Sequence, residues 1–279
     1  MRVARRVLVA MMATATVLTA QVTVTGDASI NSQYQWRGIT TTNRPVVQPD
    51  FIVTVPAGRA TVTAGAFASL EGGRYHDAAR HISENGGEKA GLAEYDLWLE
   101  SAIPVHRATF TVGATTYAYP NTAGTTSSSN TIEAYVKATF DAPFAPSLSV
   151  WQDVRAVQGA YAELSFCQGV GRFSVSALSG WNVGQTIGNG GVLGYFVRKG
   201  FTHADIATST KFSIGAVTAS PSLHVILAHD ASTFAASPTR DARAKLWFGT
   251  SLSWSRTFGR TANNAGGGAA AAAPATGTR

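Results

Sequence analysis

The sequence predicts an all-β protein, specifically a transmembrane antiparallel up-and-down β-barrel of about twelve strands. Segments in which apolar and polar residues alternate strictly recur along the chain of 279 residues, as expected for strands with two unlike faces. Charged residues make up 14% of the chain, well below the roughly 25% of soluble domains, while mean hydropathy is close to zero at +0.04. No run of about eighteen apolar residues occurs, so no transmembrane helix is expected.

The first strand is predicted at residues 22–37, with the sequence VTVTGDASINSQYQWR. Its even positions are apolar, small or aromatic, and its odd positions are polar or charged. A soluble strand usually has five or six residues, whereas a strand that crosses a bilayer at a tilt needs about ten. This run is longer than either, which favours a membrane-spanning strand with one face toward lipid.

Eleven further strands follow from the same alternation, and the connections between them alternate in length. Short connections with Pro or Gly follow the even-numbered strands, and most of those after the odd-numbered strands are longer. This pattern is typical of short periplasmic turns and longer external loops. The predicted strands contain residues 47–55, 60–70, 92–100, 108–114, 132–140, 148–154, 162–166, 173–181, 204–214, 223–227 and 244–254.

Aromatic residues on the apolar faces are predicted to form a girdle at each edge of the membrane. By strand position, the girdle at the periplasmic ends contains Phe110, Phe140, Phe166, Phe173, Phe212 and Trp254. The girdle at the external ends contains Tyr34, Trp36 and Trp181.

Both termini lie outside the predicted barrel of residues 21–258. Residues 1–20 have the pattern of a secretory signal peptide, with Arg2, Arg5 and Arg6 before an apolar core. This pattern predicts export, here to the outer membrane of a Gram-negative bacterium. Its removal takes away three of the positive charges behind the formal net charge of +6, so no nucleic-acid partner is inferred. Residues 259–279 are rich in Gly and Ala and are predicted to be disordered.

The last strand must pair with the first, because an open sheet edge in hydrocarbon would leave backbone groups without hydrogen bonds. Gly249, Leu252 and Trp254 resemble the terminal signal by which the barrel-assembly machinery recognises outer-membrane proteins. The chain departs from the usual form of that signal, because it continues past Phe258.

Odd and even positions of a strand face opposite sides of the sheet, so position along each strand (strand parity) predicts which charged residues line the lumen. Acids outnumber bases among them by nine to five. Such a lumen would pass small hydrophilic solutes and mildly prefer cations. The alternative is a narrow barrel filled by salt-bridged side chains, since twelve strands lie between filled and open sizes. Arg37 would be a gate or a loop anchor. The predicted lumen-lining residues are Asp27, Arg37, Asp50, Glu94, Asp96, Glu100, Glu133, Lys137, Asp153, Arg155, Glu163, Asp205, Lys211 and Lys245.

The block SQYQWRGIT at residues 32–40, followed by PVVQ at 45–48, resembles the N-terminal signature of the TorF-type family of predicted porins from proteobacterial outer membranes. Shorter similar pieces occur at residues 94–97, 117–120, 131–135 and 161–164, so the resemblance covers residues 25–183 in patches. Pro49 stands where the family is expected to have glycine. The resemblance implies a porin and supplies neither a substrate nor catalytic residues.

Other functions have weaker support in the sequence, and no cofactor or metal is expected. An outer-membrane lipase or protease would need a serine and a histidine within hydrogen-bond reach. His203, His224 and His229 lie on or near strands, but no serine lies in a nucleophile-elbow motif and the serines at 127–129 are predicted to lie in a loop, so no enzyme is expected. His76, His81 and Glu84 match no metal-ligand spacing. The glycines at 188, 190 and 191 lack the context of a phosphate loop. A structural or adhesive barrel remains the alternative to a channel, and the oligomeric state is left open.

Overall fold

The computed structural model describes residues 21–73, 82–87, 90–121, 130–186, 194–229 and 244–259, and all regular elements within these ranges are strands. No helix in the described part of the chain is long and apolar enough to cross a membrane. The predicted signal peptide at 1–20 and all but the first residue of the predicted tail at 259–279 lie outside the described residues.

Twelve strands form the wall of a closed barrel, and every neighbouring pair is antiparallel. A short strand, β13 (Phe212–Ile214), pairs with the beginning of β14 beyond the end of β12. The wall strands are β1 (Val22–Asn31), β4 (Val46–Ala57), β5 (Ala60–Glu71), β6 (Gly91–Val105), β7 (Ala108–Ala118), β8 (Thr131–Phe140), β9 (Ser147–Asp153), β10 (Ala160–Val170), β11 (Phe173–Asn182), β12 (Gly200–Thr210), β14 (Val217–Ala228) and β15 (Ala244–Phe258).

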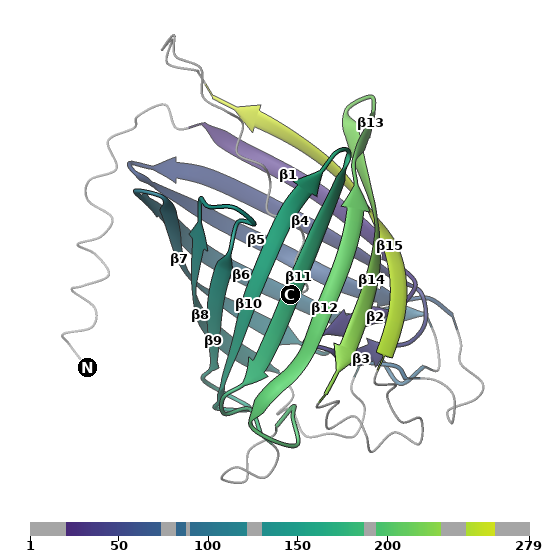
Figure 1. Cartoon of the computed structure of the whole chain (residues 1–279). Coiled ribbons are helices and arrows are strands. Elements are labelled where there is room, and N and C mark those ends of the chain that lie inside the picture. The colour runs from purple at the N-terminus through teal and green to yellow at the C-terminus, as the bar shows by residue number, and fades with distance from the viewer. Residues whose placement is uncertain are drawn as a thin grey trace, which may run out of the picture.

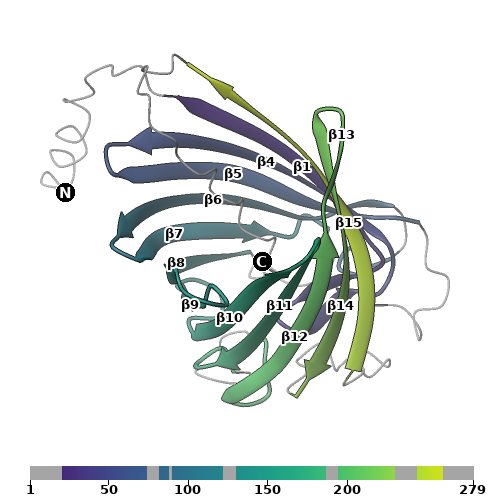
Figure 2. The same ribbon diagram turned by 45° about the horizontal axis from the view of Figure 1, so that its top comes forward.

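The barrel closes where β1 pairs with β15, from Val22 opposite Phe258 to Asn31 opposite Gly249. Figures 1 and 2 show the closed ring, with the start of β1 and the end of β15 at the same end. We call this the turn end, because short turns at 58–59, 106–107 and 171–172 join strands there, and the opposite end the loop end. The predicted fold of twelve antiparallel strands, closed by the first and last, is confirmed.

The outer face of the wall is apolar, as the alternation predicted. Leu97, Leu99 and Val112 are more than half exposed, whereas Trp98, between the two leucines, is 7% exposed. The aromatic residues assigned to the periplasmic ends (Phe110, Phe140, Phe166, Phe173, Phe212 and Trp254) are all exposed, at 39% to 51%. Trp181, assigned to the external girdle, is half-buried.

Some strand boundaries differ from the predicted ones. The segment predicted as one strand at 204–214 is interrupted at Lys211. β14 begins at Val217, before Pro221, whereas the sequence pointed to a strand after the proline. On one side of β14, Pro221 lies opposite Thr250 of β15. On the other side, the pairing of β14 with β12 stops at Ser222. Pro221 is tolerated because its missing N–H therefore interrupts no hydrogen bond to β12.

The largest difference concerns the first predicted strand, which ends at Asn31 instead of Arg37. The chain turns at Ser32, whose N–H donates to the Phe248 carbonyl and whose Oγ accepts from the Phe248 N–H, at 2.9 and 3.1 Å. It then forms a separate two-stranded sheet, β2 (Tyr34–Trp36) and β3 (Ile39–Thr42), which lies inside the ring of strands (Figures 1 and 2).

The prediction that Tyr34 and Trp36 belong to an outer aromatic girdle is therefore wrong, since they are only 8% and 7% exposed. Alternation records that a strand has two unlike faces. It carries no information on whether the strand belongs to the wall or has turned into the interior.

One close contact inside the wall gives a stability prediction. Gly65 on β5 lies opposite Trp98 on β6, and a Cβ at this position would overlap the indole ring. We expect Gly65→Ala to lower the free energy of unfolding by about 1–3 kcal/mol, because the buried ring has to move. The stability loss can be measured by heating samples to increasing temperatures before electrophoresis. The temperature at which the compact band of the folded barrel disappears is the transition temperature.

The matched control is Gly26→Ala on β1, where a Cβ would meet nothing within 4 Å. This variant should retain the transition temperature of the wild type. Equal transition temperatures for the two variants would contradict the role given to Gly65.

Candidate functional site: a hairpin inside the barrel

The interior of the barrel is closed in its loop half and accessible in its turn half. Inward-facing side chains near the loop end, such as Glu94, Glu133 and Tyr161, are at most 2% exposed. Inward-facing Glu100 and Lys137, nearer the turn end, are half-buried. The difference arises because the β2–β3 hairpin fills the loop half, where every residue from Tyr34 to Thr42 is buried. The candidate site is therefore this hairpin and its contacts with the wall.

The tip of the hairpin is a two-residue turn between Trp36 and Ile39, which are register partners. Its central residues, Arg37 and Gly38, have φ angles of 50° and 79°. Positive φ at both central positions defines a type I′ turn, whose twist matches that of the flanking strands. Gly38 is also required by space, because a Cβ there would lie 2.6 Å from the His203 Cβ on β12.

The turn carries Arg37 to Glu133 on β8, on the other side of the lumen. Arg37 Nη1 and Nη2 each donate to one oxygen of the Glu133 carboxylate, both at 2.7 Å. The two side chains are 3% and 1% exposed, so the ion pair is buried. Bidentate pairing of this kind fixes direction as well as distance and is among the stronger hydrogen-bonding arrangements in proteins.

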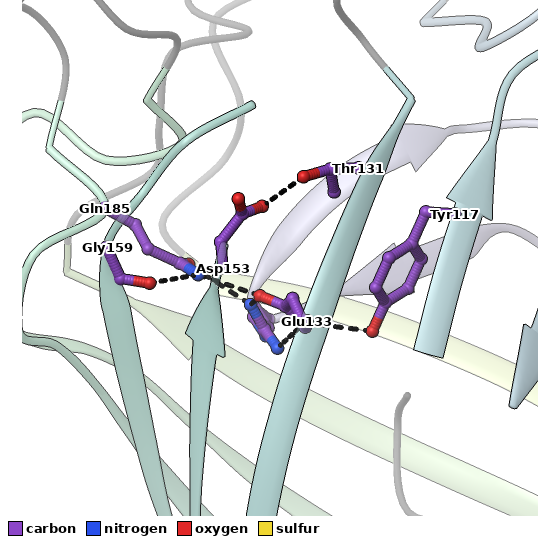
Figure 3. Close-up of polar contacts among 7 residues, drawn as sticks. Tyr117, Thr131, Glu133, Asp153, Gly159 and Gln185 are labelled. Atoms are coloured by element: carbon purple, nitrogen blue, oxygen red, sulfur yellow. Dashed lines mark hydrogen bonds and ion pairs between the residues drawn. The ribbon is translucent and has the colours of Figure 1, made fainter. Parts of the chain in front are cut away.

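The Glu133 carboxylate is fully satisfied by neighbouring donors (Figure 3). Besides the two bonds from Arg37, Oε1 accepts from Gln185 Nε2 at 2.8 Å and Oε2 accepts from the Tyr117 hydroxyl at 3.0 Å. Four donors thus occupy the roughly four acceptor positions of a carboxylate. A buried ion pair that is completed in this way avoids most of the cost of unsatisfied charge.

Aromatic rings enclose the Arg37 guanidinium. Its Cζ lies 4.4 Å from the ring centroid of Trp36 and 4.3 Å from that of Tyr161, with Trp151 at 5.3 Å. Such cation–π contacts strengthen where water is excluded. Burial by itself would lower the Arg37 pKa, but the Glu133 carboxylate more than offsets this and raises the pKa above its ordinary value. Arg37 therefore remains charged.

Two further contacts hold the hairpin in place. Lys245 on β15 donates from Nζ to the Gly38 carbonyl at 2.6 Å, at the tip. At the base, the Thr42 hydroxyl donates to Glu71 on β5. Glu71 also accepts from the Ser83 hydroxyl and the Glu84 N–H, each at 2.6 Å, so it joins the hairpin to the 82–87 segment.

An apolar cluster packs around the hairpin. It consists of Tyr34, Trp36, Ile39, Val46, Tyr161 and Phe196. Tyr161 on β10 and Phe196 stack with ring centroids 5.7 Å apart and an interplanar angle of 6°, and Tyr195 contacts the Trp36 ring edge-on at 4.7 Å. The loop half of the lumen thus has its own hydrophobic core, which a freely open channel would not need.

Several acidic residues lie near the base of the hairpin. Glu94 and Asp96 on β6 are 2% and 1% exposed. Burial, followed by the charge of Glu94, raises the pKa of Tyr34 well above its ordinary value. Burial and the neighbouring carboxylates of Glu94, Glu71 and Asp96 likewise raise the pKa of Glu84. This region therefore disfavours additional negative charge.

The predicted lumen-lining residues fall into three groups. Arg37 anchors the hairpin, one of the two roles considered for it. Arg155 and Lys211 are exposed and lie outside the strands, so the structure does not place them on the inner wall. The remaining residues lie on wall strands and are buried or half-buried, namely Asp27, Asp50, Glu94, Asp96, Glu100, Glu133, Lys137, Asp153, Glu163, Asp205 and Lys245.

Asp153 has a structural role that parity did not predict. Its Oδ1 accepts from the N–H groups of Arg155, Val157 and Gln158 at 2.9–3.2 Å. Its Oδ2 accepts from the Thr131 hydroxyl at 2.6 Å, a bond that Figure 3 shows. The side chain thus organises the connection between β9 and β10 and is 0% exposed. A solute in the lumen would not meet it.

Gln185 and Tyr117, which complete the hydrogen bonding of Glu133, are not among the residues predicted from the sequence. Gln185 lies in the connection after β11, and its N–H donates to Asn182 Oδ1 at 2.6 Å, which fixes the local turn. Tyr117 lies on β7, and its odd or even position along the strand was enough to predict that its side chain faces the lumen. No signal in the sequence marks a loop glutamine as a partner of a strand glutamate.

Within the described residues, no group of three or more His, Cys, Asp or Glu side chains has the arrangement of a metal site. His76, His81, the serines at 127–129 and the glycines at 188, 190 and 191 lie outside the described residues. Cys167, the single cysteine of the chain, is half-buried, and its Sγ lies 3.2 Å from the Ser174 Oγ.

A closed, even-numbered, antiparallel barrel with an apolar outer face and a polar interior defines a bacterial outer-membrane β-barrel. The chain belongs to the family described as "Bacterial protein of unknown function (Gcw_chp)", whose model matches residues 15–194. The sequence matches no curated protein.

Several solved outer-membrane proteins have similar structures. An outer-membrane channel from Pseudomonas putida F1 is 12% identical, with 88% of this chain and 97% of that chain covered and a TM-score of 0.45. The KdgM porin in complex with disordered oligogalacturonate is 5% identical, with 83% and 98% covered and a TM-score of 0.43. Outer membrane phospholipase A from Escherichia coli is 10% identical, with 83% and 89% covered and a TM-score of 0.42. Since channels and an enzyme are both among them, no function follows from these similarities.

The buried ion pair gives a prediction that a double-mutant cycle can test. Arg37→Met and Glu133→Gln should each lower the free energy of unfolding by about 3 kcal/mol, because each leaves a buried charge without its partner. The double variant should lose less than the sum of the two, by about 2 kcal/mol. Urea unfolding of the barrel in lipid vesicles measures all four proteins. Additive losses would show that the two side chains do not stabilise each other.

Proposed function

We propose that this protein is an outer-membrane channel for the passive diffusion of small hydrophilic solutes, narrowed at its loop end by the β2–β3 hairpin. The observation behind the proposal is the division of the lumen. Its turn half is polar and accessible. Its loop half is closed by the β2–β3 hairpin, which is anchored at its tip by Arg37 and Lys245 and packs against Tyr195 and Phe196 of the β11–β12 connection. Displacement of the hairpin would extend the polar lumen toward the loop end.

The charges in the accessible half favour cations. Asp27, Asp50 and Glu100 are half-buried inward-facing acids, and Lys137 is a base in the same half. A ring of carboxylates raises the local concentration of cations and excludes anions. The preferred solutes would therefore be small hydrophilic molecules that are neutral or positively charged.

The resemblance of residues 32–48 to the TorF-type porins agrees with this proposal. In that setting, the exposed apolar band contacts outer-membrane lipid, and the barrel-assembly machinery inserts the chain after export by its signal peptide. The loop end would face the exterior, as the predicted orientation requires. The proposed diffusion itself involves no chemical step and no cofactor.

A non-conducting structural or adhesive barrel is the second candidate function. The observation that favours it is the burial of both faces of the hairpin, together with the apolar cluster of Tyr34, Trp36 and Ile39 that surrounds it. A segment packed in this way resembles the core of a small domain, and a permanent plug would be packed in the same way.

Single-channel conductance in a planar bilayer separates the two candidates. We expect the wild type to conduct in small, infrequent steps, and a variant in which residues 33–43 are replaced by a short Gly-Ser linker to conduct in larger, persistent ones. Arg37→Ala should lie between them, because the tip has lost its anchor. The structural plug is supported instead if neither the wild type nor Arg37→Ala conducts while both are folded and inserted.

Arg107→Ala is the matched control for the arginine variant. Arg107 also forms an ion pair, with Asp141 at 4.0 Å, but both side chains are at least 77% exposed and the pair lies at the turn end. Removal of an exposed pair of this kind changes stability very little. The conductance of Arg107→Ala should equal that of the wild type.

Ion selectivity tests the assignment of the charges. In the linker variant, the combined change Asp27→Asn and Glu100→Gln should lower the permeability ratio of potassium to chloride, while Lys137→Gln should raise it, since the two changes move the lumen charge in opposite directions. Reversal potentials in a salt gradient measure the ratio. If all three proteins show one ratio, these side chains do not face the conducting path.

A further inference from the structure

Three polar side chains on the inner wall form a chain of hydrogen bonds separate from the hairpin. Ser222 and His224 lie on β14, and Asp205 lies on the neighbouring β12. His224 Nε2 is 3.3 Å from Ser222 Oγ, and His224 Nδ1 is 3.1 Å from Asp205 Oδ2. A serine hydroxyl, an imidazole and a carboxylate in this order form the arrangement that activates a serine as a nucleophile.

We infer that Ser222, His224 and Asp205 form a hydrolytic site inside the barrel that cleaves small carboxylic esters. This inference is independent of the proposed channel. Ser222 would be the nucleophile and His224 the general base. Asp205 would be a positioning residue that accepts from His224 Nδ1–H and so leaves Nε2 free to accept the serine proton.

The strand geometry accounts for the arrangement. Residues two apart on a strand point to the same face, so Ser222 and His224 both point into the lumen. Ala207 on β12 is the register partner of His224. Asp205 lies two residues before Ala207 on the same strand and therefore faces the lumen as well. On the other side, the Trp247 ring of β15 stacks on the imidazole, with centroids 3.8 Å apart and an angle of 14°, which restricts rotation of the histidine.

The surroundings of Asp205 differ from those of a structural carboxylate. Asp153, the structural example in this chain, accepts four hydrogen bonds from the backbone and Thr131. Asp205 is 6% exposed, its Oδ2 is bonded to His224, and its Oδ1 is buried without a hydrogen-bond partner among the described residues. A buried carboxylate that is incompletely bonded is costly, which points to a role other than stability.

Ser222 is also accessible. It is half-buried, whereas Ile226, farther along β14 toward the loop end, is 1% exposed. The accessible turn half of the lumen therefore extends to the serine and allows a small ester and water to reach it. Ser209, the register partner of Ser222 on β12, brings a second hydroxyl beside it, the kind of donor that stabilises an oxyanion.

The reaction would be an acyl transfer followed by hydrolysis. Ser222 Oγ forms a bond to the ester carbonyl carbon while its proton moves to His224 Nε2. The carbon–oxygen bond to the leaving alcohol then breaks, and the alcohol takes the proton from His224. Water then attacks the acyl carbon of the serine ester and gives a proton to His224. The bond from this carbon to Ser222 Oγ breaks, Oγ takes the proton from His224, and the carboxylic acid leaves. The excess of carboxylates in the lumen would favour neutral or cationic esters over anionic ones.

The test uses the refolded full barrel in detergent with two probes, a fluorophosphonate that labels activated serines and p-nitrophenyl acetate. We expect one fluorophosphonate adduct per chain, at Ser222 by mass spectrometry, and measurable release of p-nitrophenol. Ser222→Ala should abolish the adduct. His224→Gln should slow labelling by about 100-fold or more, because the serine loses its base.

Ser220→Ala is the matched control, since Ser220 is half-buried on the same strand and has the same parity but lies outside the hydrogen-bond chain. Its labelling should equal that of the wild type. Asp205→Asn should lower kcat for p-nitrophenyl acetate and leave KM unchanged, whereas a merely structural loss would reduce the fraction of folded barrel and leave kcat per folded molecule intact. Heat-resistant mobility in electrophoresis reports that fraction.

No labelling of a folded wild-type barrel would overturn the proposal. An adduct that persists in Ser222→Ala, or that forms at the same rate in His224→Gln, would also overturn it, because the reactive group would then be elsewhere or would need no base.

Discussion

The structure depends on closure of the hydrogen-bonded ring, which the pairing of β1 with β15 completes. A bilayer offers no water to satisfy an open strand edge, so the sheet has to close on itself before its apolar face can enter lipid. Closure also creates an interior that twelve strands make too wide for wall side chains alone to fill, as they do in eight-stranded barrels. The space is occupied at one end by the chain itself. The hairpin that follows β1 is therefore a consequence of the number of strands as much as of its own sequence.

The hairpin is held by polar contacts at its tip and apolar contacts along its body. Arg37 and Glu133 form a bidentate pair in which each carboxylate oxygen accepts two hydrogen bonds, and the rings of Trp36 and Tyr161 cover the guanidinium. Such a pair contributes more to the position of the hairpin than to net stability, because desolvation of two charges offsets much of their attraction. Release of the hairpin would require these charged contacts to exchange with water or solute and the apolar contacts of Tyr34, Trp36 and Ile39 to separate.

The barrel interior has two regions with different chemistry. In the loop half, aromatic and acidic side chains pack tightly around the hairpin. In the middle of the wall, Ser222, His224 and Asp205 lie near the boundary of the accessible half. The serine was not marked by any motif, because the usual signature places the nucleophile on a sharp turn between a strand and a helix. Two-residue spacing on a strand brings a serine and a histidine together equally well, and the third partner comes from the neighbouring strand β12.

The sequence by itself determined the wall of the barrel. Alternation with a period of two is a local property of any strand with unlike faces, and it correctly predicted twelve strands and the exposed aromatic residues near the turn end. Their closure followed from the cost of an open sheet edge in lipid. Only the tertiary structure decided that Tyr34 and Trp36 leave the wall at Ser32, that Gln185 and Tyr117 complete the shell of Glu133, and that Asp153 organises a turn. These outcomes depend on which side chains meet across the lumen. That is set by register and closure among strands far apart in the chain, and alternation describes only the two faces of each strand.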